Sequence, residues 1–90
     1  MRRAAKVDAN QDQIVSALRA AGASVQSLAP IGKGCPDILA AIQGHMFLME
    51  IKRPKGKTND TQDKWHITWN APVYVVRDPD EALRVIGALA

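Results

Sequence analysis

Two carboxylates and a lysine are the residues whose types and spacing could do chemistry. Asp37 follows a proline, and Glu50 and Lys52 flank Ile51 at the end of an apolar run. Side chains two positions apart on a strand share one face, so Glu50 and Lys52 would point the same way. Charged groups beside a core cost free energy unless they are paired or bind an ion. The pattern therefore favours a chemical role for these residues.

The chain reverses around Gly44, which predicts that the two carboxylates meet across a hairpin. Asp37 and Glu50 each lie about six residues from that turn, so pairing of the strands brings them level. Adjacent anions repel unless a cation neutralises them, and Mg²⁺ or Mn²⁺ takes such oxygen ligands, with the Ile51 carbonyl available as a third. Lys52 would then face the attacking water or a phosphate. The predicted chemistry is phosphodiester hydrolysis.

Periodicity and capping signals predict the elements that position these residues, in the order αβββαβα. A capping box of Asn59 and Gln62 and an Asp78-Pro79 start mark the second and third helices, and Gly22 ends the first. We expect an α/β fold with a small central mixed sheet flanked by helices. The expected helices cover about 8–21, 60–69 and 79–89, and the expected strands cover 25–28, 37–42, 46–52 and 73–76.

Composition limits the class of protein. Ninety residues, 47% of them hydrophobic, form one domain and exclude a disordered chain. One cysteine excludes an intrachain disulfide, and no Cys/His grouping has zinc spacing. Without a signal peptide or a stretch of transmembrane length, we expect a cytoplasmic protein with no membrane contact. The net charge of +3 suits a polyanion partner, and residues 1–7 are expected to form a flexible basic arm.

Three segments together resemble a known family: Gly34-Cys35-Pro36-Asp37, then Glu50-Ile51-Lys52-Arg53-Pro54, then Gln62. They look like the PD-(D/E)XK nuclease superfamily and, more narrowly, its VRR-NUC type, the virus-type replication and repair nuclease domain. The resemblance runs from about Asp8 to Leu89 and includes the order of elements. It implies a restriction-endonuclease-like fold.

The same resemblance implies roles for individual residues. Asp37, Glu50 and the Ile51 carbonyl would bind the metal, Lys52 would be the catalytic lysine, and Gln62 would be an active-site residue on a helix. The family usually has a Glu on the first helix, where this chain has Gln11 on the inward face with Asp12 beside it. We therefore expect one main metal ion, with Gln11 just outside its direct ligands.

Stand-alone members of this type are similar to junction-resolving endonucleases that act as homodimers and are often encoded by phages. The resemblance thus implies a Mg²⁺- or Mn²⁺-dependent DNA endonuclease that cuts branched DNA such as four-way (Holliday) junctions. Basic residues beside the predicted site would contact the phosphates of that DNA. These residues are Lys33, Arg53, Lys55 and Lys57.

Simpler interpretations stay open for each residue. Asp37 could cap a turn, Glu50 and Lys52 could form a cross-strand ion-pair ladder, and Gln11 and Gln62 could serve only as capping partners. The protein could accordingly be a catalytically silent nucleic-acid-binding module, or an accessory subunit of a replication or repair assembly. Four further side chains have mainly packing interpretations: Trp65 and Trp69 as core or dimer contacts with base stacking as a lesser option, His66 as a packed or surface residue, and Cys35 as a loop filler.

Overall fold

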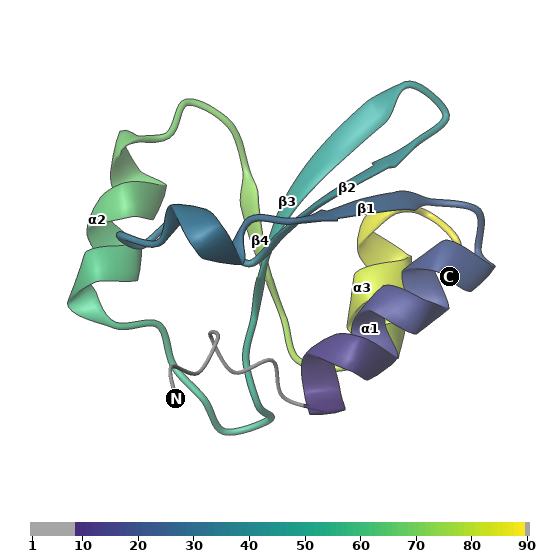
Figure 1. Ribbon diagram of the computed structural model, residues 1–90, viewed down its shortest axis with the longest axis horizontal. Helices are drawn as coiled ribbons and strands as arrows, with labels where there is room; N and C mark the ends of the chain where they lie inside the picture. The colour runs from purple at the N-terminus through teal and green to yellow at the C-terminus, as the bar shows by residue number, and fades with distance from the viewer. Residues whose placement is uncertain (1–8, 90) are drawn as a thin grey trace, which may run out of the picture.

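The computed structural model describes residues 9–89, which form a four-stranded sheet with helices on both sides (Figure 1). The predicted order αβββαβα is confirmed, with one added 3₁₀ turn, η1. The predicted bounds of the strands and of the first two helices hold to within one residue, and the expected basic arm lies outside the described residues. The elements are α1 (Ala9–Ala20), β1 (Ser24–Ser27), η1 (Ala29–Ile31), β2 (Ile38–Ile42), β3 (His45–Ile51), α2 (Asp60–Thr68), β4 (Val73–Val76) and α3 (Pro79–Val85).

The sheet has the strand order β1-β2-β3-β4, in which only the β3–β4 pair is parallel. Gln43 and Gly44 join β2 to β3 with positive φ angles of 52° and 81°. Two left-handed residues of this kind form the hairpin turn whose twist matches that of the flanking strands. The resulting register pairs Ile38 with Met49, so that Asp37 and Glu50 lie at the next level along the hairpin. The predicted alignment of the two acids is therefore confirmed.

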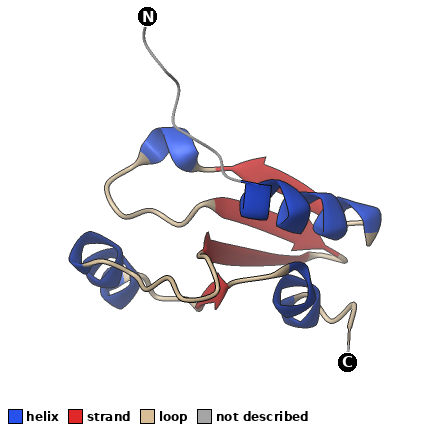
Figure 2. Ribbon diagram, turned by 90° about the horizontal axis from the view of Figure 1, so that it is seen from below, coloured by secondary structure: helices blue, strands red, loops and turns tan. Residues whose placement is uncertain are grey.

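One face of the sheet is covered by α1 and α3, which lie side by side (Figure 2). Their apolar stripes meet the alternate strand residues that point toward them, as the helical and strand periods require. The other side carries η1 and α2, which lie near one end of the sheet (Figure 1). The core cluster is Ile14, Leu18, Ala23, Ile38, Ala40, Met49, Val76 and Ala82.

Glycines end both helices of the core layer. Gly22 has φ +99°, and the Ala23 N–H donates to the Leu18 carbonyl at 3.0 Å, which closes α1 as predicted. The third helix was predicted to reach about Leu89, which is wrong. Gly87, with φ +80°, stops it instead, so that α3 ends at Val85. A glycine in the left-handed region outweighs the apolar periodicity that continues beyond it.

The apolar run of β3 is buried only in its second half. Met46 is 71% exposed, whereas Met49 and Glu50 are buried. Because the tip of the β2–β3 hairpin extends past the helices, the expected sheet-interior environment begins only farther along the strand (Figure 1). None of the helices within residues 9–89 is long and apolar enough to cross a membrane.

Candidate active site

Asp37 connects the start of β2 to the end of β3 through two hydrogen bonds. Its main-chain N–H donates to the Met49 carbonyl at 3.0 Å, and its carboxylate Oδ2 accepts from the Ile51 N–H at 2.6 Å. The side chain thus reaches across the hairpin toward β3, and the interpretation as a simple turn cap is not supported. A carboxylate that accepts a main-chain N–H keeps a defined direction, which a ligand site requires.

Glu50 is the one buried charged residue in the described part of the chain, with an exposed fraction of 1%. Burial, followed by hydrogen bonding and charge from the Asp37 carboxyl, raises the pKa of Glu50 to about 8, and the charge of Lys52 opposes this shift. The two acids are therefore close enough to share a proton or a cation. A solvated ion-pair ladder does not describe this environment.

Gln62 links α2 to Glu50. Its side-chain oxygen accepts from the Asn59 N–H at 3.0 Å, and its own N–H donates to Asn59 Oδ1 at 2.9 Å, which confirms the predicted capping box. The Nε2 of the same amide donates to Glu50 Oε2 at 3.0 Å. Gln62 therefore caps α2 and also contacts the Glu50 carboxylate, and its role in catalysis stays a prediction.

His66 lies one helical turn after Gln62 and approaches the other oxygen of the same carboxylate. Its Nε2 is 3.4 Å from Glu50 Oε1. Both atoms are buried, and neither has a hydrogen-bond partner among the described residues. This contact was not predicted from the sequence, in which His66 has a packing or surface interpretation. Its spacing of four from Gln62 on the helix was the available signal.

Lys52 lies just past β3 and is partly buried, and its charge acts on Glu50. The main chain around it is held from two sides. The Lys52 N–H donates to the Val76 carbonyl at 3.0 Å, and Asn10 Nδ2 on α1 donates to the carbonyls of Lys52 at 2.9 Å and Arg77 at 3.2 Å. The first helix therefore meets the site through Asn10.

Gln11, by contrast, lines a shallow hollow of about 270 Å³ beside α1, together with Ser27 and Ile38. Asp12 lines the same hollow and is exposed. The role of Gln11 near a metal ion stays a prediction. Cys35 lies near the acids, and burial, with the charges of Glu50 and Asp37, raises the pKa of its thiol. A protonated thiol fits the predicted space-filling role.

The four basic residues expected to bind phosphates are all exposed. Arg53, Lys55 and Lys57 follow Lys52 in a loop that Arg77 Nη2 holds through the Gly56 carbonyl at 3.1 Å. Lys33 lies in a separate loop, between η1 and β2. Their positions are compatible with DNA contacts, which remain a prediction.

Gly34 sets how closely α2 approaches the acids. It has φ +84°, and a Cβ added there would overlap the main-chain carbonyl of Thr61, next to Gln62. We expect Gly34→Ala to lower the free energy of unfolding by about 1–2 kcal/mol for the left-handed backbone and about 1–3 kcal/mol more for overpacking. Urea denaturation measures this loss.

The matched control is Gly32→Ala, at a glycine with φ +65° and no atom within 4 Å of an added Cβ. It should show only the backbone cost. Equal losses in the two variants would contradict the importance of the Gly34–Thr61 approach.

Asp37 offers a test of repulsion between the acids. In metal-free buffer, Asp37→Asn should leave the free energy of unfolding unchanged or higher, because the amide oxygen can still accept from Ile51 N–H while the charge beside Glu50 is lost. Asp37→Ala removes the acceptor as well and should cost about 1–3 kcal/mol. Thermal denaturation in a chelator compares the two. A large loss in the Asn variant would indicate a structural carboxylate.

Among the described residues, no three His, Cys, Asp or Glu side chains converge as a metal cluster. Any cation here would therefore rely on Asp37 and Glu50, with main-chain oxygen or water completing its shell. Glu50 Oε1 indicates whether a cation fits these residues. This oxygen is buried, has no hydrogen bond, and belongs to a carboxylate that lies beside Asp37. An oxygen-preferring divalent cation suits this donor set.

Comparison with family models and with curated proteins gives no match. A solved structure described as a VRR_NUC domain matches with a TM-score of 0.70 and 26% sequence identity, over 84% of this chain and 88% of that chain. The likeness thus spans most of both chains. This structural likeness supports a VRR-NUC domain with the restriction-endonuclease-like fold, a nuclease domain of the PD-(D/E)XK type.

Proposed function

We propose that the protein is a metal-dependent endonuclease that hydrolyses phosphodiester bonds in branched DNA, such as four-way junctions, as a homodimer in the cytoplasm. The observation that best supports this function is the buried Glu50 carboxylate beside Asp37, which has an oxygen without a hydrogen bond. Two acids held side by side, one of them buried, cost folding free energy, so their presence calls for a functional reason.

Asp37, Glu50 and the Ile51 carbonyl would hold one Mg²⁺ or Mn²⁺ ion. When bound, such an ion supplies Lewis-acid stabilisation of the charge that develops on the phosphate. Gln62 Nε2 and His66 Nε2 face the two oxygens of Glu50, at 3.0 Å and 3.4 Å, and would fix the direction of that carboxylate. Such outer contacts orient a ligand before the cation arrives.

Lys52 would act on the reacting groups themselves. In the hydrolysis, a water oxygen bonds to phosphorus, one P–O ester bond breaks, and the leaving oxygen takes up a proton. The Lys52 ammonium, whose charge acts on Glu50, would orient that water and offset negative charge on the phosphate oxygens. Arg53, Lys55, Lys57 and Lys33 would contact the DNA backbone on either side.

A second candidate, a catalytically silent nucleic-acid-binding module, is favoured by one observation. The first helix carries Gln11 where the family usually has a Glu, and Gln11 lines a hollow beside α1. Such a module would keep the basic loop and bind DNA without turnover. An accessory role in a replication or repair assembly would follow in the same way.

The test combines a labelled four-way junction, Mn²⁺ and the purified protein, with calorimetry of Mn²⁺ binding on the same sample. The endonuclease requires cleavage by the wild type and metal uptake that Glu50→Gln abolishes. DNA binding without cleavage, together with no uptake of metal, would establish the silent module instead.

A further inference from the structure

A buried nitrogen faces a buried oxygen in the site, and neither has a hydrogen-bond partner among the described residues. The nitrogen is His66 Nε2 on α2 and the oxygen is Glu50 Oε1 on β3, 3.4 Å apart. The side chain of His66 is 19% exposed and that of Glu50 is 1% exposed. Buried polar atoms without partners cost folding free energy. The contact therefore calls for a third atom that would satisfy both.

The second oxygen of the Glu50 carboxylate is already occupied. Oε2 accepts from Gln62 Nε2 at 3.0 Å. Because Gln62 and His66 are four residues apart on α2, both side chains reach the carboxylate from one face of the helix. Oε1 is thus the oxygen left for an incoming ion, and His66 is the side chain that faces it.

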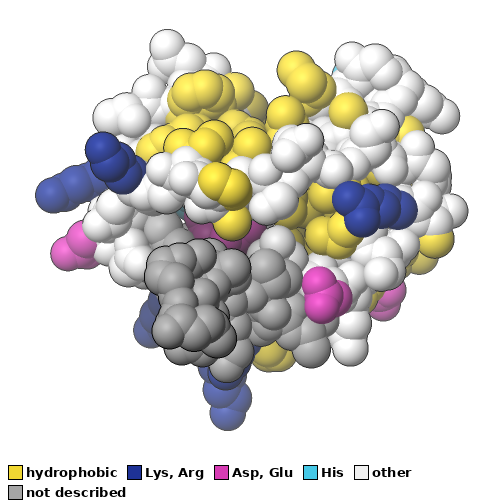
Figure 3. Space-filling model, viewed as in Figure 1, with side chains coloured by type: hydrophobic (Ala, Val, Ile, Leu, Met, Phe, Trp, Pro, Cys, Tyr) yellow, Lys and Arg dark blue, Asp and Glu magenta, His cyan; other side chains and the backbone are white. Residues whose placement is uncertain are grey.

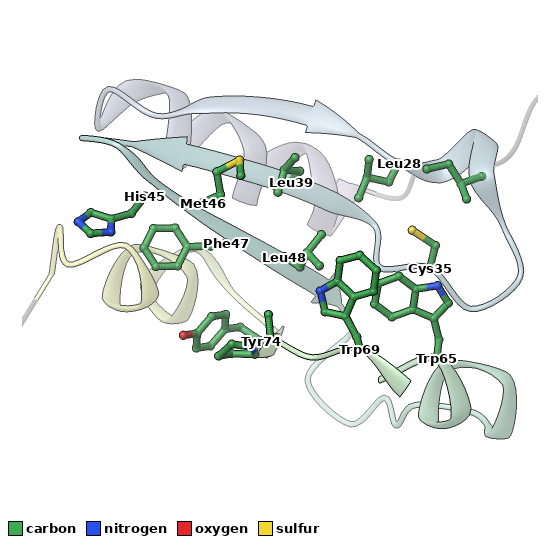
Figure 4. A pocket seen from close by; sticks show the side chains of 13 residues that line it. Leu28, Cys35, Leu39, His45, Met46, Phe47, Leu48, Trp65, Trp69 and Tyr74 are labelled. Atoms are coloured by element: carbon green, nitrogen blue, oxygen red, sulfur yellow. The ribbon is translucent and has the colours of Figure 1, made fainter. Parts of the chain in front are cut away.

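Apolar surface adjoins this contact through Trp65. The rings of Trp65 and His66 meet edge to face, with centroids 6.4 Å apart. Trp65 and Cys35 also line an open groove of about 590 Å³, and no Lys, Arg, Asp or Glu side chain of the described residues lines it (Figure 4). Hydrophobic side chains gather on this face between α2 and the hairpin (Figure 3). Low polarity here strengthens the attraction between a cation and Glu50.

The separation of the two atoms suits a shared metal ion. A hydrogen bond from a ring nitrogen to a carboxylate oxygen is usually about 2.7–3.2 Å long, and the observed 3.4 Å exceeds that range. Two ligand atoms that each lie about 2.1 Å from one ion are about 3.0 Å apart at a right angle and about 3.4 Å apart at a tetrahedral angle. The observed distance agrees with the wider of these two arrangements.

We propose that His66 Nε2 is a direct ligand of the cation that Glu50 binds, which makes the site a mixed nitrogen and oxygen site. This inference rests on the metal site of the proposed function and adds a ligand to it. Asp37 and His66 each adjoin Glu50. No three such side chains within residues 9–89 converge on one point, so the ion itself would complete the set. The orienting contact of the ion-free chain would then become a bond to the ion.

A nitrogen ligand changes which ion the site prefers. Mg²⁺ takes oxygen ligands, whereas imidazole suits Zn²⁺ and other transition ions. With His66 as a ligand, the site should bind Zn²⁺ more tightly than Mg²⁺, and only the affinity for Zn²⁺ should depend on the imidazole. A histidine that merely orients Glu50 would affect the affinities for both ions to the same extent.

The experiment is calorimetric titration of the purified chain with Zn²⁺ and, separately, with Mg²⁺. His66→Gln keeps a hydrogen-bond donor beside Glu50 but removes the ring nitrogen. It should lower the affinity for Zn²⁺ by more than about 100-fold, beyond the loss of about 10–100-fold that is typical of residues that only orient a ligand. Its affinity for Mg²⁺ should be nearly unchanged.

The matched control is His45→Gln, at the other histidine of the chain, which is exposed at the start of β3. This variant should bind both ions as the wild type does. Circular dichroism confirms that each variant is folded. Loss of Zn²⁺ affinity in His45→Gln, with His66→Gln unaffected, would overturn the proposal.

Electron spin-echo envelope modulation of the Mn²⁺ complex tests the bond directly and needs no variant. A bound imidazole nitrogen modulates the echo of the electron spin on the ion, so the wild type should show nitrogen coupling. His45→Gln should keep this coupling and His66→Gln should lose it.

These outcomes are separate from those that test the endonuclease. Mn²⁺ uptake that Glu50→Gln abolishes, without nitrogen coupling in the wild type, would overturn the role of His66 and leave the metal site in place. Equal losses of Zn²⁺ and Mg²⁺ affinity in His66→Gln would also overturn it and would show that His66 only orients Glu50. A wild type that takes up no metal would overturn the endonuclease together with this ligand.

Discussion

Lys52→Ala should reduce cleavage of a four-way junction by about 10²–10³-fold, the usual cost of removing one group that stabilises developing charge. The fold should survive, because the contacts of this residue that hold β3 use its main-chain N–H and carbonyl, which the substitution keeps. Single-turnover cleavage with saturating Mn²⁺ measures the effect. Calorimetry of the same variant should still detect metal, because Lys52 supplies no ligand.

The control for Lys52→Ala is a pair of exposed lysines in the following loop. Lys55→Ala and Lys57→Ala should weaken DNA binding and flatten its salt dependence by about one unit each, with the single-turnover rate at saturation nearly unchanged. Cleavage by Lys52→Ala at the wild-type rate would remove this lysine from the mechanism. If the loop variants lose as much of the single-turnover rate as Lys52→Ala, then Lys52 acts only by attracting phosphates.

The stability of the metal-free protein should fall as the pH rises from about 4.5 to about 8. The pKa of Glu50 is raised from its ordinary value of 4.5 to about 8 in the folded chain, so the folded state holds a proton that the unfolded state releases. The contribution is complete below the unfolded pKa and is lost as the pH passes through the folded one. The loss is on the order of a few kcal/mol.

Thermal denaturation in a chelator at several pH values measures this loss, and Glu50→Gln isolates it by removing the titrating group. Adding Mn²⁺ should raise the melting temperature far more at pH 8 than at pH 5, because a cation binds the ionised carboxylate and competes with its proton. Equal pH dependence in the wild type and in Glu50→Gln would contradict a buried, proton-binding Glu50.

The sequence was sufficient for the arrangement of the acids because their pairing depends on local rules. A two-residue turn at Gln43 and Gly44 fixes the register of the hairpin, and the register fixes the level of Asp37 and Glu50. The capping box at Asn59 is equally local. The order of the elements along the chain was predictable on these grounds, whereas the approach of α2 to the site through Gln62 was expected only from the family resemblance.

Contacts between distant segments were not predictable in this way. Asn10 reaches Lys52 and Arg77 across 42 and 67 residues, and nothing near Asn10 in the sequence indicates either partner. His66 has an ordinary packing interpretation until α2 is placed against Glu50. The exposure of Met46 depends likewise on which side of the sheet the helices leave uncovered, and periodicity alone does not fix that choice.

The amide of Gln62 joins two tasks that proteins usually keep apart. Its oxygen closes the first turn of α2 at Asn59, and its nitrogen holds Glu50. The Gln62 amide can therefore follow a movement of the Glu50 carboxylate only if its hydrogen bond with the Asn59 N–H breaks, and that bond belongs to the first turn of α2. Glu50 is in this sense anchored to the start of α2. A rearrangement of the two acids would therefore also change the residue at which α2 begins.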